Sequence, residues 1–182
     1  YGVLYDVDMR LRPSGRAGPV ASRIDSFSDY QRSEAWTWEH QALLRARAVA
    51  GPPALRERFE SVRCDILRFG IRRTTLREEV RKMRERMRSE LSRSGPGQFD
   101  IKQDPGGITD IEFLAQYWTL RWCDRHAELV TYSDNIRQLE ALARGVGPAA
   151  GAVTNRDVNP FAEEFAEVGG RAHLDAEVGV LE

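Results

Sequence analysis

The sequence has few lysines and cysteines and no long apolar run. Two of its 27 basic residues are lysines, and its two cysteines, Cys64 and Cys123, lie far apart. This excludes a small protein held together by disulfides, and we expect both cysteines to be small buried side chains in a reducing cytosol. No stretch approaches the roughly 18 apolar residues of a membrane span, so we expect no membrane-spanning segment.

An excess of charge of either sign is also missing. The chain carries 27 basic and 28 acidic residues, for a net charge of -1 at pH 7. Such a balance gives no general attraction to nucleic acid or to an anionic membrane, so any anion-binding site must be local. The 182 residues, 41% of them hydrophobic, are typical of a globular protein with one sizeable core. The first residues show no targeting signal, and we expect a piece of a longer cytoplasmic protein.

Residues 3–11 alternate strictly between apolar and charged side chains, which predicts a β-strand. The charged face would carry Asp6, Asp8, Arg10 and Arg12. Such a face is either exposed, with its charges paired across strands, or it is a place where a divalent cation and phosphate groups bind. The glycines and prolines of residues 13–19 then predict a tight loop.

Beyond this loop the apolar residues recur at helical spacing. We expect one long helix that begins after the cap candidates Ser22 and Asp25, includes Val49 and ends at Gly51-Pro52-Pro53. Further helices are predicted over about 54–69, 75–91 and 108–126, and from Asp134, whose side chain can cap the last one. After Gly145 no apolar stripe persists, and we expect a poorly ordered tail.

Three blocks of sequence resemble the glutamate-ammonia ligase adenylyltransferase family. The blocks are residues 7–15 (VDMRLRPSG), residues 35–47 (AWTWEHQALLRAR) and residues 100–113 (DIKQDPGGITDIEF). Residues 133–137 (SDNIR) extend the match, which covers about residues 1–144 in the family's order. The resemblance implies two related nucleotidyltransferase modules in one long chain. One module transfers AMP from ATP to a tyrosine of glutamine synthetase, and the other removes it by phosphorolysis.

The resemblance implies an α/β nucleotidyltransferase fragment, with one strand of the catalytic sheet followed by a mainly α-helical, bundle-like part. Residues 1–53 would end the catalytic domain, residues 54–144 would form a helical domain, and residues 145–182 would be a tail. The run 30–40 resembles the adenylylating module more than the removing one. The family also implies ATP as substrate, Mg²⁺ as cofactor, glutamine synthetase as protein substrate and the PII signalling protein as regulator.

The same resemblance assigns the candidate site residues. Asp8 would be catalytic as a Mg²⁺ ligand, the third carboxylate of a centre whose other two come from a G-S-x-x-D-x-D segment. Because this sequence lacks that segment, we expect the isolated chain not to transfer AMP. The residues expected to bind the nucleotide are Arg10, Arg12, Ser14, Gly15, Arg45 and Lys102, since guanidinium groups and loop amides suit phosphate oxygens.

Ordinary structural roles stay open for several of these residues. Arg10 and Arg12 can pair with nearby acids, and Lys102 can be a surface side chain. Arg45 and Arg47, two apart on a helix, would diverge by about 160°, so at most one would face the nucleotide.

Other residues of the three blocks have structural explanations too. Asp110 and Glu112 suit a helix N-terminus because of the helix dipole. Trp36, Trp38 and His40 are expected to pack rather than react.

Two other functions also stay open. The chain can come from the adenylyl-removing half of the family, or residues 54–144 can form a helical module that binds a regulator. A nucleic-acid binder is not expected at this net charge.

Overall fold

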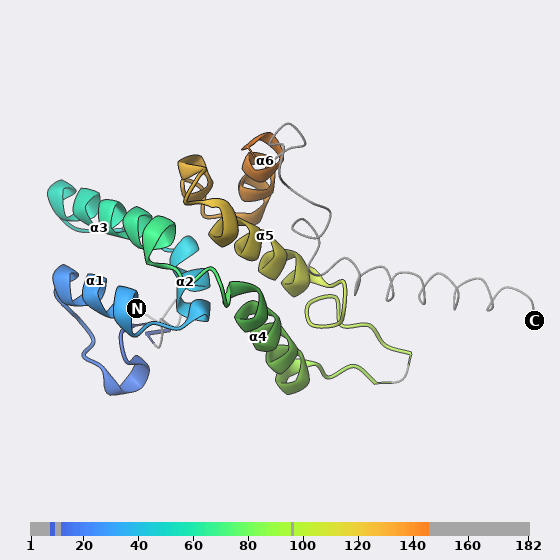
Figure 1. The fold of residues 1–182 in the computed structure, drawn as a ribbon. Helices are drawn as coiled ribbons and strands as arrows, with labels where there is room; N and C mark the ends of the chain where they lie inside the picture. The colour runs from blue at the N-terminus through green and yellow to red at the C-terminus, as the bar shows by residue number, and fades with distance from the viewer. Residues whose placement is uncertain (1–7, 10–11, 96, 146–182) are drawn as a thin grey trace, which may run out of the picture.

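The computed structural model describes residues 8, 9, 12–95 and 97–145, and these residues form a helical arrangement (Figure 1). The helices are α1 (Ile24–Ser33), α2 (Thr37–Leu44), α3 (Pro53–Asp65), α4 (Leu76–Leu91), α5 (Ile108–Trp122) and α6 (Asn135–Gly145). Shorter turns are η1 (Gly15–Ala17), the π-helical η2 (Ile66–Gly70) and η3 (Ala127–Val130). None of the helices described has the length and apolar character needed to cross a membrane.

The predicted α/β fold with a catalytic strand is wrong, because the described residues form six α-helices and no strand. Asp8 and Met9 have no regular structure, and Arg12 lies in a bend before η1. The rest of the predicted strand falls outside the described residues. A strand must exchange backbone hydrogen bonds with a neighbouring strand, and alternation of side chains does not provide that neighbour.

The predicted long helix is also wrong, since α1 ends at Ser33 and α2 begins at Thr37. Between them Trp36 has an extended backbone, and its amide donates a 3.1 Å hydrogen bond to Oε1 of Glu39. The remaining helices lie where the apolar spacing predicts them, within a few residues at each end. Asp134 caps α6 as expected, with its Oδ1 accepting a 3.0 Å hydrogen bond from the amide of Arg137.

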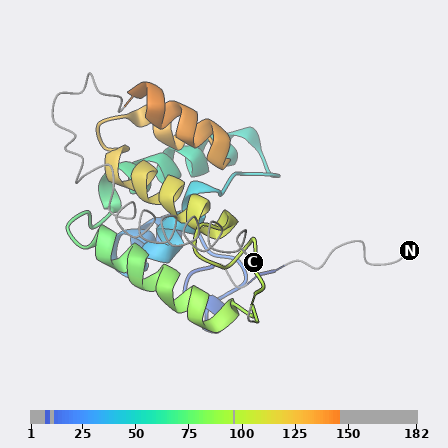
Figure 2. The same ribbon diagram turned by 90° about the vertical axis from the view of Figure 1, so that its right-hand side faces the viewer.

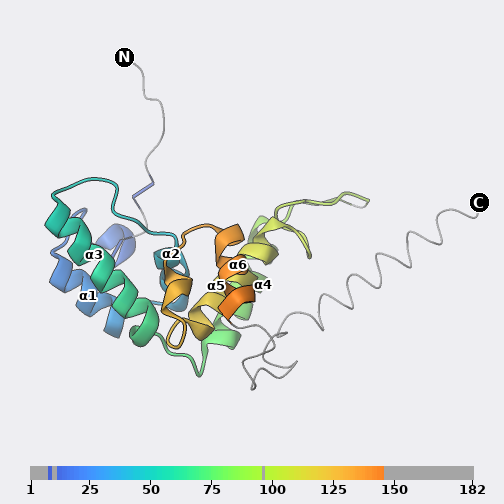
Figure 3. The same ribbon diagram turned by 90° about the horizontal axis from the view of Figure 1, so that it is seen from above.

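Helix α2 lies at the centre of this arrangement. It contacts α4, α5 and η2. Helix α5 packs between α4 and α6 (Figures 1 and 2), whereas α1 and α3 lie side by side beyond α2 (Figures 1 and 3). The predicted domain boundary at residue 53 stays a prediction, but one hydrophobic cluster draws residues from both sides of it.

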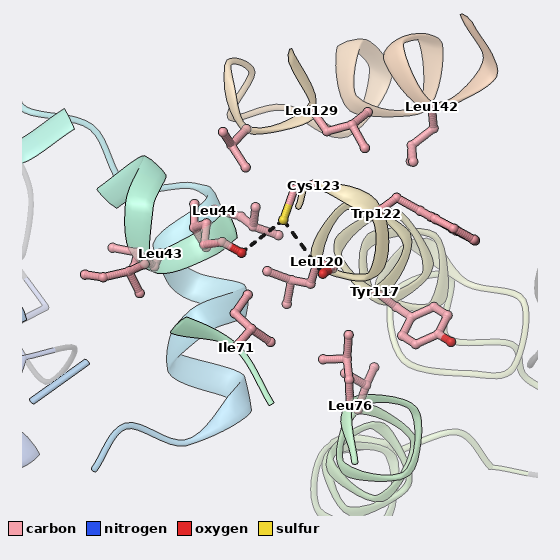
Figure 4. Close-up of a cluster of buried hydrophobic side chains, with 14 of the residues drawn as sticks. Leu43, Leu44, Ile71, Leu76, Tyr117, Leu120, Trp122, Cys123, Leu129 and Leu142 are labelled. Atoms are coloured by element: carbon pink, nitrogen blue, oxygen red, sulfur yellow. Dashed lines mark hydrogen bonds between the residues drawn. The ribbon is translucent and has the colours of Figure 1, made fainter. Parts of the chain in front are cut away.

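The core of the protein is a cluster of aliphatic and aromatic side chains between α2, α4, α5, η2 and η3 (Figure 4). Leu44, Leu76, Leu120 and Leu129 have no exposed surface. Burial of this apolar surface is the main favourable term of folding. The cluster also includes Cys123, whose Sγ donates to the backbone oxygen of Leu67 at 3.0 Å.

One charged side chain, Arg63 of α3, is buried beside this core with 5% of its surface exposed. Its Nη2 donates to the backbone oxygen of Val130 at 2.7 Å, and its Nη1 lies 3.5 Å from the backbone oxygens of Leu43 and Leu44. Its Nε donates to Oε2 of Glu60 at 2.8 Å. The guanidinium group therefore joins α3 to the end of α2 and to η3.

We expect Arg63→Met to lower the free energy of unfolding by about 3 kcal/mol, because buried carbonyl oxygens lose their donors. Urea unfolding followed by circular dichroism measures the change. Arg86→Met is the matched control, since Arg86 makes only a helix-surface ion pair with Glu90. A stability of Arg63→Met equal to that of the control would show that the buried guanidinium group is not needed.

The two cysteines should differ in reactivity. Burial raises the pKa of the Cys123 thiol to about 11, so at pH 8 it holds almost no thiolate. Cys64 is only half-buried. We expect iodoacetamide to modify Cys64 first and Cys123 only after unfolding, as measured by mass spectrometry of peptides. Equal labelling of both thiols in the folded protein would contradict the packing around Cys123.

Candidate functional site

A cavity of about 510 Å³ lies between α1, α2, α3 and the loop after Arg12. Its apolar lining comes from Phe27, Ala42, Leu43, Ala46 and Phe59. Arg12, Arg45 and Glu39 add charged groups to this lining. A cavity of this size with apolar walls and a few convergent polar groups is typical of a small-molecule site.

Two of the residues predicted to bind nucleotide, Arg12 and Arg45, line this one cavity. Nε of Arg12 donates to the backbone oxygen of Gly18 at 3.3 Å, and its Nη1 donates to the backbone oxygen of Met9. No carboxylate of the described residues pairs with Arg12. Its guanidinium group holds the loop closed beside the cavity, and its role as a nucleotide ligand stays a prediction.

Arg45 directly follows α2 and reaches two distant segments of the chain. Its Nη1 donates to Oε1 of Glu112 at 3.0 Å and lies 3.3 Å from Oδ1 of Asn135. The second and third sequence blocks and the segment 133–137 therefore meet at this guanidinium group. Arg47 lines a different cavity, so the two arginines do diverge. The cause is not helix geometry as predicted, because α2 has already ended at Leu44.

Glu39 also lines the cavity, although it is not among the residues that the sequence predicts for the site. Its Oε1 accepts hydrogen bonds of 3.1 Å from the hydroxyl of Tyr30 and from the amide of Trp36. Burial and, after it, the nearby charge of Glu39 raise the pKa of Tyr30, so the phenol keeps its proton and donates. The one signal in the sequence is the spacing Trp36-x-x-Glu39, which suits an acid near a helix start.

The loop predicted to cradle phosphates uses most of its amides internally. Ser14 and Gly15 have positive φ angles of 59° and 53°, and η1 follows. The amides of Gly15, Ala17 and Gly18 donate to carbonyl oxygens of the same loop at 2.8 to 3.2 Å. A bound phosphate would therefore find few free amide donors in this loop. The binding roles of Ser14 and Gly15 stay predictions.

The remaining predicted site residues lie elsewhere. Asp8 is exposed, and Arg10 falls outside the described residues. Lys102 is exposed in the loop between α4 and α5, which extends on the far side of the fold from residues 12–20 (Figures 1 and 3). The structure brings Arg12 and Arg45 to one cavity and does not bring Lys102 there.

The loop that carries Lys102 is fixed by a buried ion pair between α4 and α5. Nε of Arg84 lies 2.5 Å from Oδ1 of Asp110, and these side chains are 3% and 7% exposed. The other carboxylate oxygen of Asp110, Oδ2, accepts a 2.7 Å hydrogen bond from the amide of Gly106. A side chain at Gly107 would place its Cβ 2.6 Å from the backbone oxygen of Ile101. Gly107 and Asp110, both in the third sequence block (residues 100–113), therefore have structural roles.

The aromatic residues of the second block behave unequally. Trp36 is 68% exposed and Trp38 is 37% exposed, so the prediction that both pack is wrong for Trp36 and holds only in part for Trp38. His40 is buried, as expected, and its Nε2 lies 2.9 Å from the backbone oxygen of Gln31. This histidine ties α2 to α1 and does not line the cavity.

The described residues do not form a Mg²⁺ site by themselves. No group of three or more His, Cys, Asp or Glu side chains gathers among them in a way that could hold a metal ion. Mg²⁺ needs several oxygen ligands in octahedral geometry, and Asp8 supplies one carboxylate. The predicted role of Asp8 as a metal ligand therefore stays a prediction.

The buried His40 should make stability depend on pH. Burial lowers its pKa below the ordinary value of 6.5, so the folded state favours the neutral ring and the unfolded state binds the proton more readily. Stability contributed by neutral His40 is present above pH 6.5 and is lost as the pH falls from there toward the lower folded pKa. We expect His40→Gln to lose less stability than the wild type between pH 7 and pH 5, as measured by thermal unfolding. Parallel curves for the two proteins would contradict this.

Two family models match this chain. A glutamate-ammonia ligase adenylyltransferase model matches residues 1–62, and a GlnD PII-uridylyltransferase model matches residues 77–164. The first match covers α1, α2 and most of α3, which line the cavity, and the second covers α5, α6 and nearly all of α4. Both models describe nucleotidyltransferases, so they support a nucleotidyltransferase role in general. Together the two matches support a relationship of this chain to the glutamate-ammonia ligase adenylyltransferase family.

Proposed function

We propose that this chain is part of an adenylyltransferase that moves AMP from ATP to a tyrosine of glutamine synthetase in the cytoplasm. We further propose that the nucleotide binds in the cavity lined by Arg12 and Arg45. One observation carries this proposal. Both arginines line the same cavity, and they belong to the segment that the adenylyltransferase model matches.

The lining of the cavity suits the two parts of a nucleotide. Guanidinium groups form charge-assisted hydrogen bonds to phosphate oxygens, so Arg12 and Arg45 suit the phosphate end. The apolar side chains of Phe27, Ala46 and Phe59 suit the base. During transfer the tyrosine oxygen bonds to the α-phosphorus, the bond to pyrophosphate breaks, and the tyrosine proton is released.

Arg45 can change partners at little cost. Its ion pair with Glu112 is partly exposed, with 41% and 34% of the two side chains accessible. Such a pair contributes under about 1 kcal/mol. A phosphate group in the cavity offers a stronger partner, so we propose that nucleotide binding draws Arg45 away from Glu112.

The proposal predicts that Arg12→Gln and Arg45→Gln each weaken ATP binding about tenfold or more, because each loses a charge-assisted hydrogen bond. Isothermal titration calorimetry with the full chain measures this. Arg58→Gln is the matched control, since Arg58 pairs with Asp25 and does not line the cavity.

An equal loss of affinity in Arg58→Gln would mean that only the overall charge matters. Glu112→Gln sharpens the test because it releases Arg45 without removing it. We expect this variant to bind ATP at least as tightly as the wild type. Unchanged binding in Arg45→Gln would overturn the assignment of the nucleotide to this cavity.

The direction of the reaction is a separate part of the proposal. The run 30–40 resembles the adenylylating module, so we propose transfer of AMP and not its removal. Release of pyrophosphate by the active enzyme supports transfer. Incorporation of labelled phosphate into ADP, with AMP-modified glutamine synthetase as substrate, would instead identify the removing half.

A second candidate function is binding of the PII protein by the helical part. The match of residues 77–164 to a PII-uridylyltransferase model favours it, because that enzyme acts on PII by its name. Helices α4, α5 and α6 would then form the docking unit. Capture of PII by the full chain, unchanged in Asp8→Asn and Arg45→Gln, would support this function, and no capture would exclude it.

A further inference from the structure

A second cavity, of about 360 Å³, lies beside the first. The two cavities share Phe27 and Phe59, whose ring centroids are 6.0 Å apart. The rest of its lining comes from the segment between α2 and α3, from the first turns of α3, and from Ser22 and Ile24. The aromatic pair therefore forms a wall that the two neighbouring cavities share.

The charged residues that line the second cavity are all basic. Arg47 and Arg56 both line it, and no Asp or Glu is part of its lining. Neither arginine forms an ion pair with any residue that the structure describes. The neighbouring Arg58 and Arg63, in contrast, are paired with Asp25 and Glu60.

A sharp turn of the chain lies between these two arginines. Gly51 has a φ of +108°, a conformation that strongly favours glycine, and Pro52 and Pro53 then start α3. Residues before this turn and residues in the first turns of α3 line the same cavity. Arg47 and Arg56 thus reach one cavity from the two sides of the turn.

We propose that the second cavity binds a small phosphate monoester whose organic part is apolar. Arg47 and Arg56 would hold the dianionic phosphate, and the hydroxyl of Ser22 would donate to it. The organic part would lie against Leu55 and the shared wall of Phe27 and Phe59. This binding site is separate from the nucleotide cavity and does not depend on the nucleotide proposal.

The two cavities differ in the charge of ligand that they favour. The first cavity contains Glu39 and an arginine already paired with Glu112, so part of its positive charge is compensated. The second has two arginines and no acid in its lining, which suits a dianion. Its smaller volume suits a compact phosphate monoester better than a nucleoside triphosphate.

The experiment titrates the full chain with phenyl phosphate and follows its ¹³C-labelled alanine methyl groups by NMR. Ala48 and Ala50 line the second cavity, whereas Ala42 and Ala46 line the first. We expect the methyl signals of Ala48 and Ala50 to shift. Inorganic phosphate should bind more weakly than phenyl phosphate, because it lacks the apolar part.

The variants Arg47→Gln and Arg56→Gln should each weaken phenyl phosphate binding about tenfold. Arg58→Gln should leave it unchanged, since Arg58 does not line this cavity. Arg45→Gln should also leave it unchanged, so the present proposal and the nucleotide proposal can fail separately. Shifts confined to Ala42 and Ala46, equal losses in Arg58→Gln, or no binding at all would each overturn the proposal.

Discussion

The geometry of both cavities depends on where α2 ends, and a buried guanidinium group stabilises that end. The last carbonyl groups of an α-helix have no partners within the helix. Arg63 of α3 reaches the backbone oxygens of Leu43 and Leu44 and also binds that of Val130. Because the helix stops there, the segment that follows is free to line one cavity with Arg45 and the other with Arg47.

Arg45 joins the second sequence block, residues 35–47, to the third block, residues 100–113, and to the segment 133–137. Its contacts with Glu112 and Asn135 join positions 67 and 90 residues away. One helical turn earlier, Gln41 donates to Gln116 at 2.9 Å in a buried contact. These blocks therefore combine two roles, because the residues that connect the helices also lie next to the proposed nucleotide cavity.

The helices after residue 53 were predictable from the sequence, whereas the break before α2 was not. Apolar spacing continues across residues 34–36, and only the extended backbone at Trp36 separates the two helices. At Asp8 and Met9 the strand prediction fails because alternation describes one segment and not its neighbours. The burial of Arg63 and Glu39 was not predicted, for a common reason. Charged residues are normally exposed, and the apolar pattern does not reveal that Tyr30 and Trp36 bind Glu39 or that carbonyl oxygens 19 to 67 residues away bind Arg63.

The position of bound ATP tests the central claim most directly. Nuclear Overhauser effects between the ATP protons and the methyl groups of the full chain would measure it. We expect cross-peaks from the adenine and ribose protons to Ala42, Leu43 and Ala46, which line the nucleotide cavity. Cross-peaks only to methyl groups outside both cavities, such as those of Ile108 and Ile111 on α5, would contradict it.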